Sequence, residues 1–417
     1  MATITENLQT IKDSTMAIKQ AIIEKGGQVG DFTTYAEAIA NLPSGGDVNP
    51  TASKNDVTFY DYDGTIRYSY TTEEFLALTE MPPLPTQKGL ICQEWNWSYE
   101  DAMEYVAEYG VLNVGATYIT DDGKTRLYIR IAAEGRMDVP LYFQQTAANG
   151  VTIDWGDGSP TETLDSTGEV NTTHRYASIG NYMISLDVTE GCTLSLGYDN
   201  LLCVIGPTEI SSPYLSYLEK VEIGTSVMLN IGAFINCRAL REVTIPNGID
   251  ILTNFVFRST NLNAVVIPSS VSNIGSYCFY SANLRTAVLS NSIVYLGNYA
   301  FQNCQNLNGV ILGVTLKPFY NAIFSNCYAI TFIVLPNNLA SITSSYFQNC
   351  YGMAFYDFSH HTAVPSLVNT NAFQNIPSDC KIIVPDNLYD EWVSATNWST
   401  YASYIIKKTD WDVRNNQ

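Results

Sequence analysis

A phenylalanine returns every 22 to 26 residues between positions 234 and 373. Each copy lies in a phrase of the form A-F-x-N-C-x-x-L-x-x-V-x-I-P, of which residues 233–246 are the most complete example. The last apolar positions of the phrase alternate with outward-facing ones, as a β-strand requires. One such strand cannot bury its inner face alone, so we predict stacked coils that form a long parallel sheet over a continuous core. The phenylalanines expected to fill that core are Phe234, Phe257, Phe279, Phe301, Phe324, Phe347 and Phe373.

A fixed period of this length with an L-x-x-V-x-I core is typical of a leucine-rich repeat solenoid. Over about residues 218–385 the phrases resemble the BspA-type leucine-rich repeats of bacterial and phage surface proteins. The copies at Phe257 and Phe279 are one residue shorter and lack the aligned cysteine, and the coil at residues 356–366 is longer. The resemblance implies adhesion and recognition, and it brings no catalytic residues with it.

The rest of the chain divides by composition and turn signals, and we predict a mainly β, multidomain protein. The predicted order is a helical coiled-coil anchor, a small α/β module, an immunoglobulin-like β-sandwich, the solenoid with a helical C-terminal cap, and a tail. The corresponding residues are 1–44, 50–125, 126–190, 191–400 and 401–417.

The N-terminal stretch has the spacing of a helix with one apolar seam. Thr3 and Glu6 form a capping box, and isoleucine along the seam favours coiled coils of more than two strands. We therefore predict a homo-oligomer, most simply a trimer, although a helix packed on its own domain has the same pattern. Residues 18–22, 25–26 and 35–39 resemble N-terminal segments of tailed-phage fibre and other virion proteins, which implies contact with other virion proteins. The predicted seam positions are Leu8, Ile11, Thr15, Ile18 and Ile22.

The module at residues 50–125 carries helix caps at Thr71 and Ser98 and hairpin turns at Asp63-Gly64 and Asp122-Gly123. Its conspicuous feature is Trp95-Asn96-Trp97. Two tryptophans around an asparagine can stack on a sugar, but a role in the core and in stapling the following helix is favoured. The module resembles accessory modules of phage fibre-type proteins.

Residues 126–190 alternate strongly and contain an Asp154–Trp155–Gly–Asp157 turn followed by His174 and Tyr176. This pattern resembles a PKD-type β-sandwich, which implies a spacer. A calcium site needs six or more oxygens, so the two aspartates are expected to stabilise the turn, and His174 is expected to be a strand residue. No cofactor and no metal site is predicted.

Composition limits the function classes. A formal net charge of −20 argues against binding to nucleic acid or to anionic membranes. The polar stretch after Met1 leads us to expect no signal peptide, and no apolar run is long enough for membrane insertion. Four cysteines share one repeat position, and we expect buried free thiols rather than zinc ligands there. These are Cys237, Cys304, Cys327 and Cys350.

The outward face of the predicted long sheet is apolar in its middle coils. A contiguous patch of this kind is unusual on a soluble monomer. We expect it to be covered by another subunit or by the domain at residues 126–190, with receptor binding or cover by loops of the same chain as alternatives. The predicted binding residues are Ala264, Val266, Val288, Ile311, Phe332, Val334 and Phe355.

The order of these segments predicts a non-enzymatic virion attachment protein that presents its repeats to a glycan or protein on the host surface. The predicted location is the virion surface, after assembly in the host cytoplasm. A bacterial cell-surface adhesin with the same repeats is the alternative. A glycan-processing enzyme is disfavoured because no paired acids stand in a recognisable frame.

Overall fold

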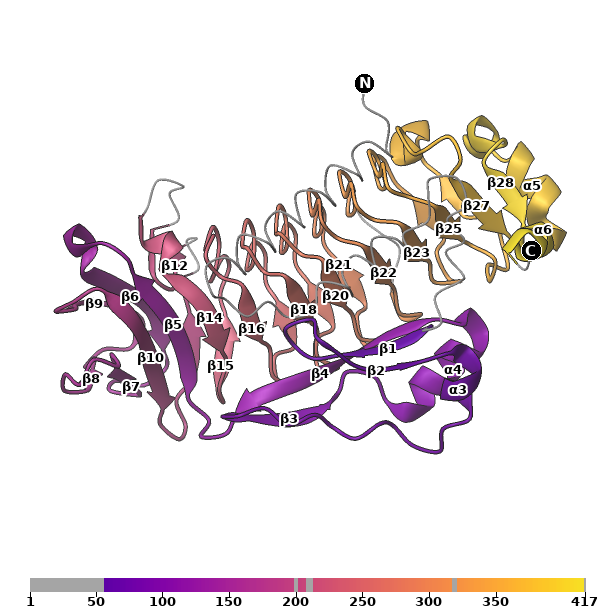
Figure 1. Cartoon of the computed structure of the whole chain (residues 1–417). Helices are drawn as coiled ribbons and strands as arrows, with labels where there is room; N and C mark the ends of the chain where they lie inside the picture. Colours follow the sequence, from indigo (N-terminus) through magenta and orange to yellow (C-terminus); the bar gives the residue numbers. More distant parts are fainter. Residues whose placement is uncertain (1–55, 199–201, 208–212, 317–320, 416–417) are drawn as a thin grey trace, which may run out of the picture. The chain divides into compact units, whose positions relative to one another are not determined.

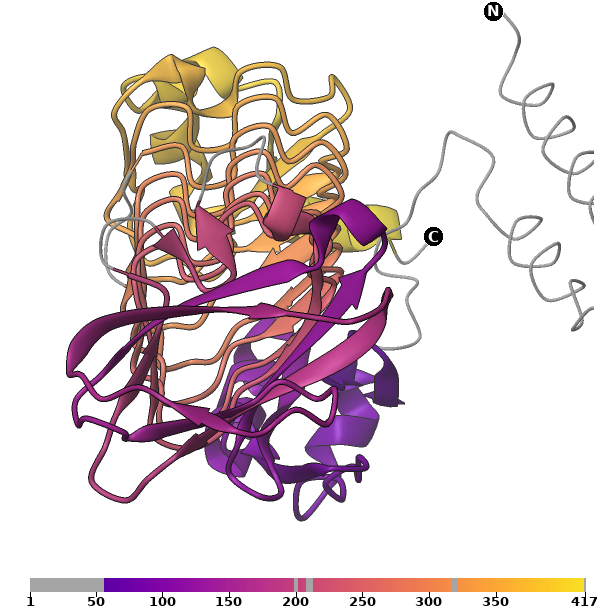
Figure 2. The same cartoon turned by 90° about the vertical axis from the view of Figure 1, so that its left-hand side faces the viewer.

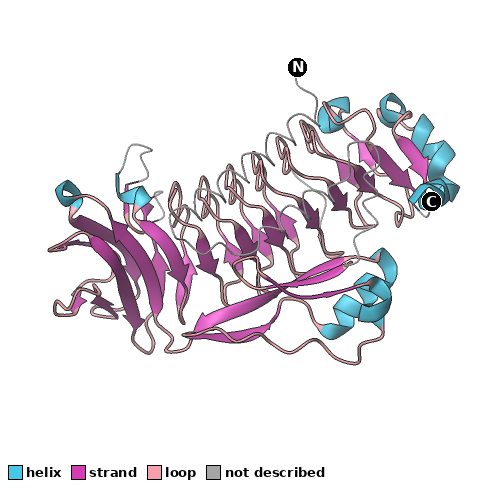
Figure 3. Cartoon of the chain, viewed as in Figure 1, coloured by secondary structure: helices cyan, strands magenta, loops and turns pink. Residues whose placement is uncertain are grey.

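The computed structural model divides the chain into two units, Met1–Ala52 and Ser53–Gln417. It describes residues 56–198, 202–207, 213–316 and 321–415. The predicted coiled-coil positions Leu8, Ile11, Thr15, Ile18 and Ile22 therefore lie outside the described residues. The second unit is mainly β and contains the predicted solenoid (Figures 1 and 3).

The small α/β module is one four-stranded sheet with two helices, and its strand order is β2-β1-β4-β3. Thr71 caps the first helix in a full capping box, and Ser98 and Gly110 cap the second, as the sequence predicts. Its elements are β1 (Val57–Tyr60), β2 (Ile66–Tyr70), α3 (Thr72–Leu76), β3 (Leu90–Trp95), α4 (Tyr99–Tyr109) and β4 (Leu112–Thr120).

The next segment forms two sheets that pack face to face at one end of the solenoid (Figure 2). The Asp122-Gly123 turn does not close a hairpin, because β4 and β5 belong to different sheets. The elements are β5 (Thr125–Ile131), a 3-10 helix (Glu134–Arg136), β6 (Asp138–Gln145), β7 (Val151–Asp154), β8 (Glu162–Thr163), β9 (Gly168–Arg175), β10 (Gly180–Val188) and β11 (Leu194–Leu196).

Both of these sheets continue into the solenoid. Strand β5 pairs with β14 (Leu218–Glu222), and β11 pairs with β15 (Val227–Leu229). One hydrophobic core runs through both regions. The predicted spacer is thus not separate from the repeats, because an open solenoid end needs a cap and these sheets supply it.

The solenoid has two rows of short parallel strands, with connecting strands β12 (Leu202–Cys203) and β13 (Gly206–Pro207) and a 3-10 helix (Pro213–Ser216) before them. The first row contains β14, β16 (Glu242–Thr244), β18 (Ala264–Val266), β20 (Thr286–Val288), β22 (Gly309–Ile311), β23 (Phe332–Val334), β25 (Phe355–Asp357) and β27 (Lys381–Val384). The second contains β15, β17 (Ile251–Leu252), β19 (Asn273–Ile274), β21 (Tyr295–Leu296), β24 (Ser341–Ile342) and β26 (Ser366–Leu367).

The phenylalanine of every repeat lies in the interior, which confirms the predicted core column. All seven are fully buried, and neighbouring rings stack; Phe279 and Phe301, for example, have centroids 5.1 Å apart. The register of the column follows the repeat length, because each coil places the same position one strand spacing further along.

The C-terminal end of the solenoid is closed by short helices and a last strand. Trp392 and Trp398 are buried and pack edge to face with centroids 5.3 Å apart. The Asp386 carboxylate accepts a hydrogen bond from the backbone N–H of Thr409 at 3.1 Å and so ties this end of the chain to the start of α6 (Lys408–Asn415). The elements are 3-10 helices Thr370–Phe373, Asp386–Leu388 and Trp398–Tyr401, helices α5 (Tyr389–Ser394) and α6 (Lys408–Asn415), and β28 (Ile405–Lys407).

A buried carboxylate joins the three segments where they meet. Glu222 on β14 is only 4% exposed, and its Oε2 lies 3.2 Å from Nη1 of Arg126 and accepts a hydrogen bond from the Tyr128 hydroxyl at 2.9 Å. Lys220 Nζ lies 3.0 Å from its other oxygen. Arg126 also contacts Asp121 and Asp122 at the end of the module. A buried charge is tolerated only when it is paired in this way.

The carboxylates of the turn between β7 and β8 form hydrogen bonds within the turn itself. Asp154 accepts the backbone N–H of Gly156 at 2.9 Å, and Asp157 accepts that of Ser159 at 3.0 Å. His174 lies on β9, with Nε2 2.7 Å from Asp157. Hydrogen bonds from Ser159 and His174 lower the pKa of Asp157 to about 2. The expected roles in the turn and in the strand are confirmed.

Candidate functional site

The apolar face predicted from the repeat is buried under the small α/β module. Ala264, Val266, Val288, Ile311 and Val334 are each at most 5% exposed, while Phe332 and Phe355 are partly buried. Strand β4 lies against β16, β18 and β20 (Figure 1), and Ile311 and Val334 share one apolar cluster with the core of the module. The expected covering by another subunit or by residues 126–190 is wrong for this face. Residues 56–120, which the sequence presents as a separate module, cover this face. Phe355 is the exception, because its ring packs against Trp411 of α6 with centroids 5.3 Å apart.

Three side chains of the module bind equivalent backbone carbonyls on successive coils. Asn96 donates to Ile267 O at 2.9 Å, and the indole N–H of Trp97 donates to Leu289 O at 2.9 Å. The Tyr105 hydroxyl donates to Leu312 O at 3.1 Å. Each of these carbonyls belongs to the residue directly after a strand of the first row. The module therefore binds the same backbone position in three successive coils of the solenoid.

This arrangement gives Trp95-Asn96-Trp97 a docking role that sequence reasoning missed. Asn96 also accepts the backbone N–H of Gly115 at 2.7 Å, and Trp95 donates to Pro82 O at 2.8 Å inside the module. The expected core role is correct for both tryptophans, which are 5% and 3% exposed. The unusual W-N-W motif was the only sequence signal of this role, and it does not indicate which backbone carbonyls the side chains bind.

Gly115 allows the close approach of β4 to the solenoid. A Cβ atom at this position would lie 2.4 Å from Cγ1 and 2.7 Å from Cγ2 of Val266. Val266 is buried and β-branched, so it cannot turn away freely. We expect Gly115→Ala to lower the free energy of unfolding by about 1–3 kcal/mol, as measured by denaturant titration, and to speed hydrogen exchange in β18.

Gly135→Ala is the matched control, because no atom lies within 4 Å of the place that its Cβ would take. Its effect should stay within about 0.5 kcal/mol. Equal destabilisation by the two substitutions would contradict the close-packing explanation.

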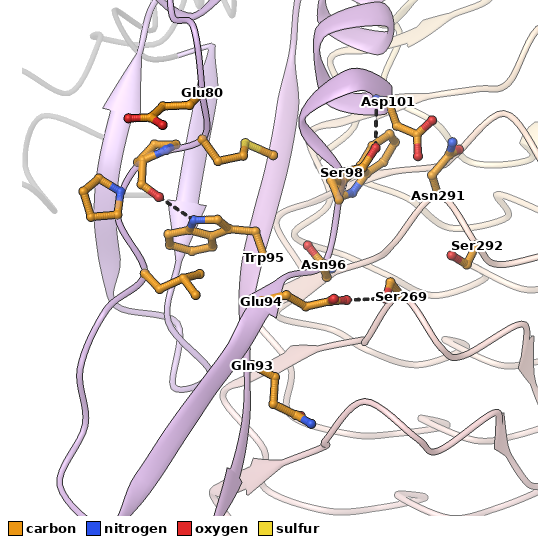
Figure 4. A pocket seen from close by; sticks show the side chains of 15 residues that line it. Glu80, Gln93, Glu94, Trp95, Asn96, Ser98, Asp101, Ser269, Asn291 and Ser292 are labelled. Atoms are coloured by element: carbon orange, nitrogen blue, oxygen red, sulfur yellow. Dashed lines mark hydrogen bonds between the residues drawn. The ribbon is translucent and has the colours of Figure 1, made fainter.

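A groove opens at the edge of this docked face, with a volume of about 680 Å³. One wall comes from the loop after α3, from β3 and from the start of α4, and the other comes from two coil turns of the solenoid (Figure 4). Trp95 and Trp97 form part of the lining on the module side, and Asn291 and Ser292 line it on the solenoid side. The groove exists only because the module is docked, so the sequence could not indicate it.

The groove is acidic. Glu80, Glu94 and Asp101 line it, and no lysine or arginine is among the described residues around it. Glu80 and Asp101 are exposed, whereas Glu94 is partly buried and accepts a hydrogen bond from the Ser269 hydroxyl. The Ser98 hydroxyl accepts the backbone N–H of Asp101 at 3.0 Å as the helix cap. The free carboxylate oxygens can accept hydrogen bonds from a ligand that carries donors or positive charge.

Within the described ranges, no group of three or more histidine, cysteine, aspartate or glutamate side chains could hold a metal ion. His360 and His361 do not point to a common site. The ring of His360 packs at a tilt of 53° against Tyr109 of α4, with centroids 4.6 Å apart. His361 is buried in the C-terminal cap. In the part of the chain that the structure describes, no helix has the length and hydropathy that a bilayer span requires.

Comparison with known proteins supports the assignment of the repeats. Residues 227–354 match the model of the BspA type leucine rich repeat region in six copies. The repeats are of the BspA type. No curated protein matches the chain.

Among solved structures, a leucine-rich repeat protein from Bacteroides ovatus is 19% identical, with a TM-score of 0.32. The match covers 46% of this chain and 60% of that one. A leucine rich cell surface protein from Faecalibacterium prausnitzii is 17% identical, with a TM-score of 0.26, and the match covers 44% of this chain and 64% of that one. This chain thus spans less than two thirds of either protein.

Proposed function

We propose that the chain is a non-enzymatic recognition protein that acts at a surface, in the manner of an adhesin, and binds a basic segment of a partner protein in the acidic groove. The observation that carries this proposal is the lining of the groove, which has three carboxylates and no basic side chain. The BspA-type repeats support a surface role in general.

The docking of the module leaves the groove as a surface that a ligand can reach. The module occupies the middle of the outward sheet face, so that part of the face is closed to other ligands. The groove lies beside that face and combines parts of both segments. The net charge of −20 would also attract a positively charged partner.

A neutral sugar is a poorer fit to the same geometry. Sugar sites generally present an exposed aromatic face, but Trp95 and Trp97 are almost fully buried and their indole N–H groups are already bound within the protein. Carboxylates on the rim match guanidinium and ammonium groups better.

The proposal is tested with the full chain and a labelled oligo-arginine peptide, using fluorescence polarisation at about 0.15 M salt to screen distant charges. The double variant Glu80→Gln/Asp101→Asn removes two exposed carboxylates from the groove. We expect its affinity for the peptide to fall at least about tenfold, which corresponds to 1.4 kcal/mol.

The matched control is Glu134→Gln/Glu190→Gln, which changes the charge equally at exposed positions away from the groove. It should leave the affinity nearly unchanged. Equal losses in the two variants would show general charge attraction, and binding of neutral oligosaccharides in place of the peptide would overturn the ligand class.

A role as a virion attachment protein, with a trimeric N-terminal segment that joins other virion proteins, stays a prediction. A role as a bacterial cell-surface adhesin is its alternative. Absence of catalysis is likewise part of the proposal. If the wild-type protein released reducing ends from a polysaccharide and Glu94→Gln abolished this release, the non-enzymatic assignment would fail.

A further inference from the structure

Two buried cysteines face each other where strand β12, which precedes the solenoid, packs on the first coil. Cys203 lies on β12, and Cys237 lies in the turn after Phe234. Their sulfur atoms are 3.1 Å apart, and both side chains are fully buried. Both are free thiols in this structure.

The other cysteines of the repeat column point elsewhere. Cys304, Cys327 and Cys350 donate to backbone carbonyls of the preceding coils, at 3.1, 3.2 and 3.3 Å. Cys327 and Cys350 occupy the same position in consecutive coils, yet each thiol bonds to a carbonyl rather than to the other sulfur. Sulfur-to-sulfur contact is therefore not a general result of stacking.

Backbone hydrogen bonds hold Cys203 in its place. The next residue, Val204, donates to Ala233 O of the first coil at 3.0 Å and accepts from the backbone N–H of Tyr142 on β6 at 2.8 Å. The chain is thus fixed to the coil on one side and to the end cap on the other. A disulfide has a sulfur separation of about 2.05 Å, so closure requires a side-chain movement of about 1 Å.

We propose that Cys203 and Cys237 are a disulfide site that fastens the end cap to the first coil when the protein folds in the presence of a small-molecule disulfide. A thiolate of one cysteine attacks the oxidant and forms a mixed disulfide, releasing one small thiol. The second thiolate attacks the protein sulfur of that mixed disulfide and releases the second small thiol. The protein loses two electrons and two protons, and the oxidant gains them.

The disulfide is expected to form during folding and not in the folded protein. Burial raises the pKa of Cys237 well above its usual value, and the thiolate is the reactive form. The two cysteines are 34 positions apart in the sequence, so the bond closes a long loop and restricts the unfolded chain.

The test refolds the full chain with oxidised and reduced glutathione, isolates the monodisperse product, alkylates free thiols in denaturant and maps peptides by mass spectrometry. Of the nine cysteines, we expect seven (nine minus two) to be alkylated and the peptides of Cys203 and Cys237 to be joined. After reduction, all nine should be alkylated. Nine free thiols in the oxidised product, or a different pair joined, would overturn the proposal.

Thermal unfolding gives a second readout. The oxidised protein should melt about 5 °C higher than the reduced protein. This difference should vanish in Cys203→Ser and persist in Cys327→Ser, whose thiol donates to Phe301 O. If neither variant folds, the peptide map of the wild-type chain still decides the question, because it requires no substitution.

Discussion

Replacing Phe301 with alanine is expected to lower the free energy of unfolding by about 3–5 kcal/mol. The ring is fully buried and stacks between Phe279 and Phe324, with centroid distances of 5.1 and 5.6 Å. Its removal leaves a cavity in the middle of the column, and coils on both sides lose packing contacts. Guanidinium titration followed by circular dichroism would measure the loss.

Tyr351→Ala provides the matched control on the same solenoid. It also deletes an aromatic ring, but Tyr351 is 56% exposed and its removal opens no interior space. Its effect should remain below about 1 kcal/mol. If Phe301→Ala destabilised the protein no more than Tyr351→Ala, the ring column would not be the core of the repeats.

The C-terminal cap should lose stability as the pH falls from about 6.5 toward 4. His361 is 4% exposed, and neither ring nitrogen has a hydrogen-bond partner. Burial lowers the pKa of His361 from 6.5 to about 4. Between these values the unfolded chain binds a proton that the folded chain does not, so stability is complete above pH 6.5 and declines below it. We expect a loss of about 2 kcal/mol between pH 7 and pH 5.

The measurement is denaturant unfolding at pH 7 and pH 5 for the wild-type chain and for His361→Leu. The variant removes the titrating group from between Phe358 and Trp392. Its stability should therefore change less between the two pH values than that of the wild type. An unchanged difference would assign the pH dependence to other groups.

Local patterns were sufficient for much of the fold. The recurring phenylalanine phrase predicted the solenoid and its core, because a fixed period forces equivalent side chains into one column. The helix caps at Thr71 and Ser98 and the alternation in β5, β6 and β7 were also readable, since caps and pleats depend on neighbours within a few residues.

The apolar face was likewise visible in the sequence, but its covering was not. Val266 and Ile311 stand out as outward apolar residues, which says only that something must exclude water from them. The partner is chosen by Gly115, Trp97 and Tyr105, more than 150 positions earlier in the chain. No periodicity links such distant segments.

The sequence by itself determined the repeat, its strands and the need to cover one face. Only the tertiary structure decided which segment covers it, how the sheets of residues 125–196 close the solenoid, and where the acidic groove opens. The physical reason is that strand and repeat patterns are set by short-range periodicity, whereas docking depends on shape and on hydrogen bonds between remote backbone and side-chain atoms.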